Sequence, residues 1–120
     1  MKKILLALLV ASGTAHGAEA YIYPVRGAKV GQTIKLQFPT VLYLHEKCEL
    51  PLVNAPNMRK YVSYRGVWDV GCWGQTIDGD AFMVVPKMST TTVPLNTLMR
   101  ANVSKDWEAK ILAGPQYLNR

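Results

Sequence analysis

The segment from Arg59 to Trp68 interleaves basic and aromatic side chains, a composition suited to binding. In a strand, Tyr61 and Ser63 would share one face, and Lys60 and Tyr64 the other. Tyr, Trp and Arg anchor many protein interfaces, and aromatic rings also stack on sugars and nucleic-acid bases. The alternative is that the rings fill the core while the cations solvate its edge. We take six side chains as candidate binding residues: Arg59, Lys60, Tyr61, Tyr64, Arg65 and Trp68.

Side chains for catalysis or metal binding are sparse. His45 is the one histidine beyond the first twenty residues, and no serine lies in a nucleophile-elbow pattern. Asp78 and Asp80 flank Gly79, which turn formation explains without catalysis or calcium binding. We therefore expect no catalytic residue, no metal and no cofactor. A small hydrolase that uses His45, or Asp78 with Asp80, remains an alternative.

The N-terminus has the three parts of an export signal. Lys2 and Lys3 precede an apolar run over residues 4–11, and Ala18-Glu19-Ala20 fits the small-x-small cleavage rule. Ala15-His16-Gly17 is a second candidate boundary, three residues earlier. We expect residues 1–20 to be a signal peptide and residues 21–120 to be one domain, periplasmic or secreted. No later apolar run has the eighteen or so residues that a membrane-spanning helix needs.

Export also determines how we interpret the two cysteines, Cys48 and Cys72. In an oxidising compartment they are expected to form a disulfide, since they lack the Cys-x-x-Cys spacing of redox proteins. The bridge would close a loop of about 25 residues and stabilise the domain by about 3.5 kcal/mol.

The charge balance favours anionic partners but selects none. The chain carries 14 basic and 8 acidic residues, a net charge of +6, which becomes +5 without Lys2, Lys3 and Glu19. The cations are dispersed, with no basic arm of the kind that binds nucleic acid. We expect a protein or a cell-wall component as partner, and no specific nucleic acid.

Short β-rich runs and turn signals dominate the chain. Residues 33–38 alternate, with Ile34, Leu36 and Phe38 expected on one face. Arg65-Gly66 and Asp78-Gly79 are expected to be hairpin turns, and Gly71 a bulge or a close backbone approach. The other expected strands cover residues 41–44, 61–64, 67–73, 81–85 and 90–93.

The C-terminus predicts a short helix. Ser104 is a suitable N-cap, Trp107 and Ile111 share a face at i, i+4, and Gly114-Pro115 ends the pattern. With the preceding runs, this predicts a mainly β domain: an antiparallel sheet of five to six strands, curled into a small barrel or sandwich.

One pattern resembles a group of small exported proteins of proteobacteria and their phages. It comprises Cys48, Tyr64-Arg65-Gly66, Gly71-Cys72-Trp73, the turn at residues 78–80 and Pro94-Leu95. The resemblance covers roughly residues 40–98 and implies export, a disulfide and a β-rich fold. The group has no established activity, so the resemblance assigns no functional residue.

These observations favour a non-enzymatic binding protein of the bacterial envelope, of host or phage origin, that docks a basic and aromatic surface on its partner. An inhibitor of a wall-degrading enzyme is one concrete version. The alternatives are a self-associating structural component of an envelope or virion, and the small hydrolase described above.

Overall fold

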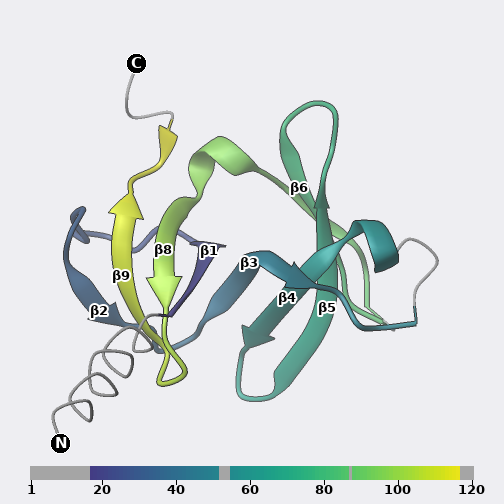
Figure 1. The fold of residues 1–120 in the computed structure, drawn as a ribbon, viewed down its shortest axis with the longest axis horizontal. Coiled ribbons are helices and arrows are strands. Elements are labelled where there is room, and N and C mark those ends of the chain that lie inside the picture. Colours follow the sequence, from purple (N-terminus) through teal and green to yellow (C-terminus); the bar gives the residue numbers. More distant parts are fainter. Residues whose placement is uncertain (1–16, 52–54, 87, 117–120) are drawn as a thin grey trace, which may run out of the picture.

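The computed structural model describes residues 17–51, 55–86 and 88–116. These residues form nine strands and two single-turn 3-10 helices (Figure 1). In chain order the strands are β1 (Ala18–Ile22), β2 (Thr33–Lys35), β3 (Thr40–Lys47), β4 (Arg59–Tyr64), β5 (Trp68–Gln75), β6 (Asp80–Val84), β7 (Thr91–Pro94), β8 (Met99–Val103) and β9 (Glu108–Ala113). The 3-10 turns are η3 (Ala55–Asn57) and η4 (Leu95–Thr97).

All nine strands belong to one antiparallel sheet in the order β2-β9-β8-β1-β3-β4-β5-β6-β7. Strands β3 to β7 form a meander in chain order, and β8 and β9 form a separate hairpin. β1 comes first in the chain but pairs with β8 on one side and with β3 on the other. The N-terminal strand therefore joins the C-terminal hairpin to the meander.

The prediction of a mainly β, antiparallel fold is confirmed, but its details change. In the described residues, the outer strands β2 and β7 do not pair with each other, so the sheet is not closed into a barrel. The sheet has nine strands instead of the predicted five to six, because the sequence patterns did not indicate strands for the segments that form β1, β8 and β9.

The short C-terminal helix predicted from Ser104 is wrong. The Ser104 Oγ accepts hydrogen bonds from the amides of Asp106 and Glu108, as the side chain of an N-cap residue would. Here, however, these bonds stabilise a turn and not the first turn of a helix. The chain then runs back along β8 as β9. Ala109 and Ile111 are buried while the residues between and before them are exposed, which is the period of a strand. This alternation prevails over the four-residue spacing of Trp107 and Ile111.

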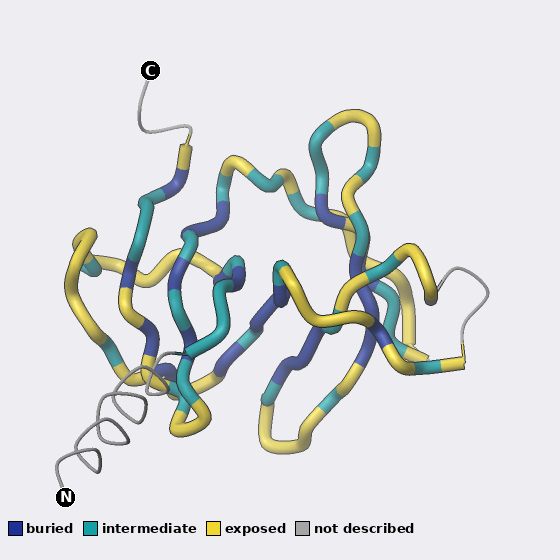
Figure 2. Tube along the Cα trace, viewed as in Figure 1, coloured by how far each residue is buried: buried dark blue, intermediate teal, exposed yellow. Residues whose placement is uncertain are grey.

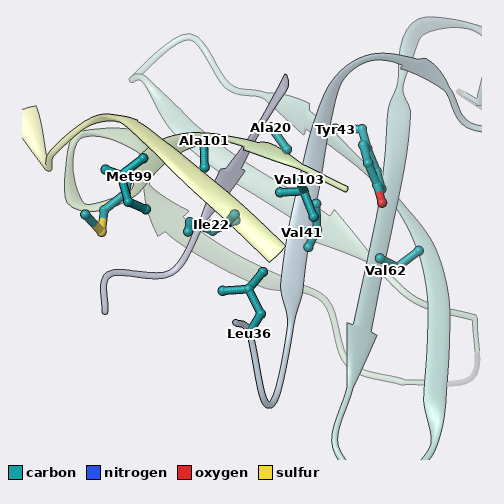
Figure 3. Packing of buried hydrophobic residues seen from close by; sticks show 11 residues of the cluster. Ala20, Ile22, Leu36, Val41, Tyr43, Val62, Met99, Ala101 and Val103 are labelled. Atoms are coloured by element: carbon teal, nitrogen blue, oxygen red, sulfur yellow. The ribbon is translucent and has the colours of Figure 1, made fainter. Parts of the chain in front are cut away.

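In β3 the successive residues Val41, Leu42 and Tyr43 are buried, whereas the last three residues of the strand are exposed (Figure 2). The buried part of β3 contributes to two separate core clusters. Val41 and Tyr43 pack in a first cluster with residues of β1, β8 and β9, shown in Figure 3. Leu42 packs on the opposite face in a second cluster with Tyr61, Trp73 and residues of β6. The two halves of the sheet thus cover opposite sides of β3, which explains its unbroken apolar sequence.

The predicted disulfide between Cys48 and Cys72 is confirmed. It ties the segment after β3 to β5, with Cα atoms 5.4 Å apart. Leu50 and Met58 pack against it, forming a third, smaller cluster.

Both predicted turns are present. Gly66 and Gly79 have φ of 95° and 86°, which glycine adopts without the steric penalty of a side chain. Gly71 is the predicted close approach, since a Cβ on it would lie 2.2 Å from the carbonyl oxygen of Val84.

The strand expected over residues 33–38 is shorter than predicted and ends at Lys35. Ile34 and Leu36 pack on the first core cluster as expected. The placement of Phe38 on the same buried face is wrong, because its side chain is 71% exposed. Within the described residues, no helix is long and apolar enough to span a membrane.

Candidate binding groove

Strand β4 separates the predicted binding residues onto two faces. Lys60 and Tyr64 alternate with Tyr61, which points to the other side of the sheet. Tyr61 is buried in the second core cluster beside Trp73, so the core interpretation holds for this ring.

The two arginines lie apart from each other. Arg59 lines a hollow with His45 and Met58, whereas Arg65 forms an ion pair with Asp69 at 3.1 Å. Three of the six predicted residues remain on one surface: Lys60, Tyr64 and Trp68.

A groove of about 720 Å³ lies between the β8–β9 turn and the strands β3, β4 and β5. Figure 1 shows that turn and the β4–β5 turn at the same end of the molecule. We call this the aromatic groove. Its lining residues are Gly17, Ala18, Tyr43, Glu46, Lys60, Val62, Trp68, Val103, Ser104, Lys105, Asp106 and Trp107.

Three aromatic rings form a continuous row at this groove. Trp68 packs against Tyr64, directly opposite it on β4, with ring centroids 4.9 Å apart. It also packs against Trp107 at 4.8 Å. These are tilted contacts within the distance range in which aromatic pairs attract. Trp68 nevertheless keeps 47% of its surface exposed, so this ring borders the groove, whereas Trp107 also packs against the first core cluster.

The turn that carries Trp107 holds this residue at a φ of 62°, in the left-handed region. The Trp107 amide donates to the Ser104 carbonyl at 3.0 Å, and the Ser104 amide donates to Glu108 at 2.8 Å. In a three-residue hairpin turn of this kind, the left-handed position ordinarily holds glycine. A bulky residue there is strained by about 1–2 kcal/mol, and such strain often marks a functional position.

Tyr43 and Lys60 form the floor beside the row. The Lys60 ammonium lies 5.6 Å from the centroid of the Tyr43 ring, within the range of a cation–π contact. Burial, and secondly the carboxylate of Glu46, raises the pKa of the Tyr43 phenol above its ordinary value of 10.0. The phenol therefore stays neutral at physiological pH and keeps its O–H group.

The formal charges that line the groove cancel. Lys60 and Lys105 are balanced by Glu46 and Asp106, and the Lys60 Nζ lies 3.8 Å from the Glu46 Oε1. The net positive charge of the chain thus comes from cations elsewhere. It can attract an acidic partner at long range, but the groove itself does not select one.

Sequence reasoning did not identify Tyr43 or Trp107 as groove residues. The predicted C-terminal helix, which does not form, contained Trp107. Tyr43 belonged to a predicted strand and was not singled out as a binding residue. The sequence did contain an indication of the hairpin that carries Trp107. Ser104-Lys105-Asp106 can form a turn, and the buried-type residues Ala109 and Ile111 then alternate with charged residues as in a strand.

The residues of the hydrolase alternative lie in different hollows. His45 is well exposed and lies 3.3 Å from Glu19. Asp78 and Asp80 line a separate hollow with Arg100. The Asp80 amide donates to the hydroxyl of Thr76 at 3.0 Å, so this segment forms the expected turn.

Among the described residues, no three His, Cys, Asp or Glu side chains gather closely enough to hold a metal ion. No protein-family model, no curated protein and no solved structure matches this chain.

Proposed function

We propose that the chain is an exported, non-enzymatic protein of the bacterial envelope that binds another protein through the aromatic groove. The observation that carries the proposal is Trp68, which is 47% exposed although Tyr64 and Trp107 hold its ring in place. An aromatic side chain fixed in this way loses little conformational freedom on binding, which is the property of an interface anchor.

The surroundings of Trp68 have the composition of a protein interface. Val67 and Val70 are 66% and 46% exposed, and they flank Trp68 on the β4–β5 hairpin. Charged side chains border this apolar centre, with Lys60 and Glu46 on one side of the groove and Lys105 and Asp106 on the β8–β9 turn. An apolar, aromatic centre with a charged rim is typical of surfaces that dock proteins.

The arrangement favours a protein over a wall glycan. A sugar stacks on the flat face of an aromatic ring, but Tyr64 and Trp107 both pack against Trp68. These two contacts leave less of the Trp68 ring free for a stacked sugar. This geometry suits an apolar side chain that projects from the partner, such as one on a loop of a wall-degrading enzyme.

The test is capture from an envelope extract with the full, exported and oxidised chain as bait. The salt concentration is about 150 mM, which screens weak surface electrostatics. The captured partner is purified and titrated against the wild type, Trp68→Ala and Ile77→Ala. Ile77 is the matched control, because it is fully exposed at the tip of the β5–β6 hairpin and does not line the groove.

We expect a partner protein that binds one-to-one and loses about 2 kcal/mol or more of binding free energy with Trp68→Ala. Ile77→Ala should bind like the wild type. Equal affinity for the wild type and Trp68→Ala contradicts the proposal. Retention on purified wall polymer without a protein partner replaces it with a glycan-binding function, and concentration-dependent dimers in sedimentation replace it with self-association.

A further inference from the structure

The position of strand β1 bears on where the export signal is removed. The two candidate boundaries lie after Gly17 and after Ala20, and both satisfy the small-x-small rule. The mature chains that they produce differ only by the tripeptide Ala18-Glu19-Ala20. The question is therefore what this tripeptide does in the folded domain.

Its backbone forms most of a central strand. Ala18, Glu19 and Ala20 pair with Val103, Asn102 and Ala101 of β8. On the other side, Ala20 pairs with Tyr43 of β3. Without the tripeptide, two residues of β1 would remain to join the β8–β9 hairpin to the meander. The facing amides and carbonyls of β8 would lose their partners.

The tripeptide also contributes buried side chains and an ion pair. Ala20 is completely buried and belongs to the first core cluster, together with Ile22 and residues of β8 (Figure 3). Glu19 pairs with the guanidinium of Arg100, and its other oxygen lies 3.3 Å from the His45 Nε2. The Nε atom of Arg100 is buried with no hydrogen-bond partner among the described residues, while the Arg100 side chain as a whole is 43% exposed.

Gly17 differs from the three residues that follow it. It precedes β1 and, among the described residues, has no register partner in the sheet. It does line the aromatic groove and lies against the end of β8, where a Cβ on it would come within 2.3 Å of the Val103 carbonyl oxygen. A cut between Gly17 and Ala18 therefore keeps every residue of the strand. Ala18 also lines the aromatic groove, so this cut would place a new α-amino group at the groove.

We propose that the export signal is removed by hydrolysis of the Gly17–Ala18 peptide bond instead of the bond after Ala20. Water adds across the bond, leaving a carboxylate on Gly17 and an α-ammonium group on Ala18. The folded, mature domain then begins at Ala18 with β1 intact. This inference rests on the export part of the proposed function and is independent of the partner that the groove binds.

The experiment is expression of the full chain in a bacterium with an export pathway, followed by N-terminal sequencing and intact-mass measurement of the exported protein. We expect a single N-terminus at Ala18. An N-terminus at Tyr21 overturns the proposed site while leaving export in place. A chain that keeps Met1 overturns both the site and the export that it rests on.

Two variants locate the recognition positions. Ala15→Leu places a bulky residue three positions before the new N-terminus and leaves Ala18 and Ala20 unchanged. It should abolish the species that begins at Ala18. The matched control is Thr14→Leu, which occupies neither small-residue position of either boundary and should be processed like the wild type. Unchanged processing of Ala15→Leu would contradict the inference.

Discussion

The indole rings of Trp68 and Trp107 lie 4.8 Å apart with their planes tilted by 32°. Trp68 begins β5, whereas Trp107 lies in the turn between β8 and β9. Three strands, β1, β3 and β4, lie between the β8–β9 hairpin and β5 in the order of the sheet. The pair thus connects the two halves of the sheet directly, across the aromatic groove.

This contact should be measurable as a coupling energy. In a double-mutant cycle of Trp68→Ala and Trp107→Ala, we expect the two losses of unfolding free energy to be non-additive by about 0.5–1.5 kcal/mol. Urea unfolding of the oxidised domain at constant m-value gives all four free energies. Additive losses would show that the rings stabilise the two hairpins independently.

The left-handed backbone of Trp107 gives a second prediction. Trp107→Ala and Trp107→Gly both remove the ring, but only glycine adopts the observed φ of 62° without strain. The glycine variant should therefore be more stable than the alanine variant by about 1 kcal/mol. Equal urea midpoints for the two variants would mean that the turn changes its conformation once the ring is gone.

The close approach at Gly71 predicts a contrast between two glycines of β5. A Cβ at Gly71 would meet the Val84 carbonyl at 2.2 Å, whereas at Gly74 the nearest atoms belong to the Met58 side chain, at 3.8 Å or more. We expect Gly71→Ala to destabilise the domain by about 3 kcal/mol, the upper range for overpacking. Gly74→Ala is the control and should change thermal stability little. Similar melting temperatures for both variants would contradict the assigned packing of β5 on β6.

Local chemistry explains which elements were predictable. The Asp78-Gly79 and Arg65-Gly66 turns depend on the conformational freedom of glycine, which is visible in a few neighbouring residues. The disulfide was predicted from the presence of two cysteines and the expectation of export. Such features need no knowledge of distant parts of the chain.

Long-range pairing explains most of what was missed. Strand β1 lies between β8 and β3, and its pairing of Ala20 with Ala101 joins residues from the two ends of the chain. Small residues next to an expected signal peptide give no local indication that they form a central strand. Trp107 reaches the groove for the same reason, because its hairpin is positioned by β1.

The candidate site was predictable only in part, because strand alternation was known but the burial of each face was not. Lys60 and Tyr64 share one face of β4, as the alternation predicts, and Trp68 lies opposite Tyr64 on the same face, although Val62 between them is buried in the first core cluster. Tyr61 alternates with them as predicted, but the strands β5 and β6 supply a second core cluster that buries it. Sequence composition does not distinguish a sheet with one core from a sheet with cores on both sides.

The central position of β1 predicts the effect of shortening it. A chain that begins at Tyr21 loses three paired residues, and we expect it to be less stable than a chain that begins at Ala18 by about 2–4 kcal/mol, given about 0.5–1.5 kcal/mol for each hydrogen bond. Urea titration of the two oxidised chains measures the difference. Indistinguishable midpoints would contradict the role of Ala18-Glu19-Ala20 in the sheet.

The buried phenol of Tyr43 predicts a loss of stability in alkaline solution. Burial, and then the Glu46 carboxylate, raises the pKa of Tyr43 above 10.0, so the folded chain keeps a proton that the unfolded chain releases. The contribution of this phenol to the free energy of unfolding should therefore be constant below about pH 10, and the free energy of unfolding should fall as the pH rises above about 10. Tyr23, whose pKa is raised mainly by burial, contributes in the same direction.

In Tyr43→Phe the alkaline decrease in the free energy of unfolding should be shallower than in the wild type, measured by urea unfolding between about pH 8 and 11. Parallel curves for Tyr43→Phe and the wild type would show that the phenol ionises as easily in the folded groove as in the unfolded chain.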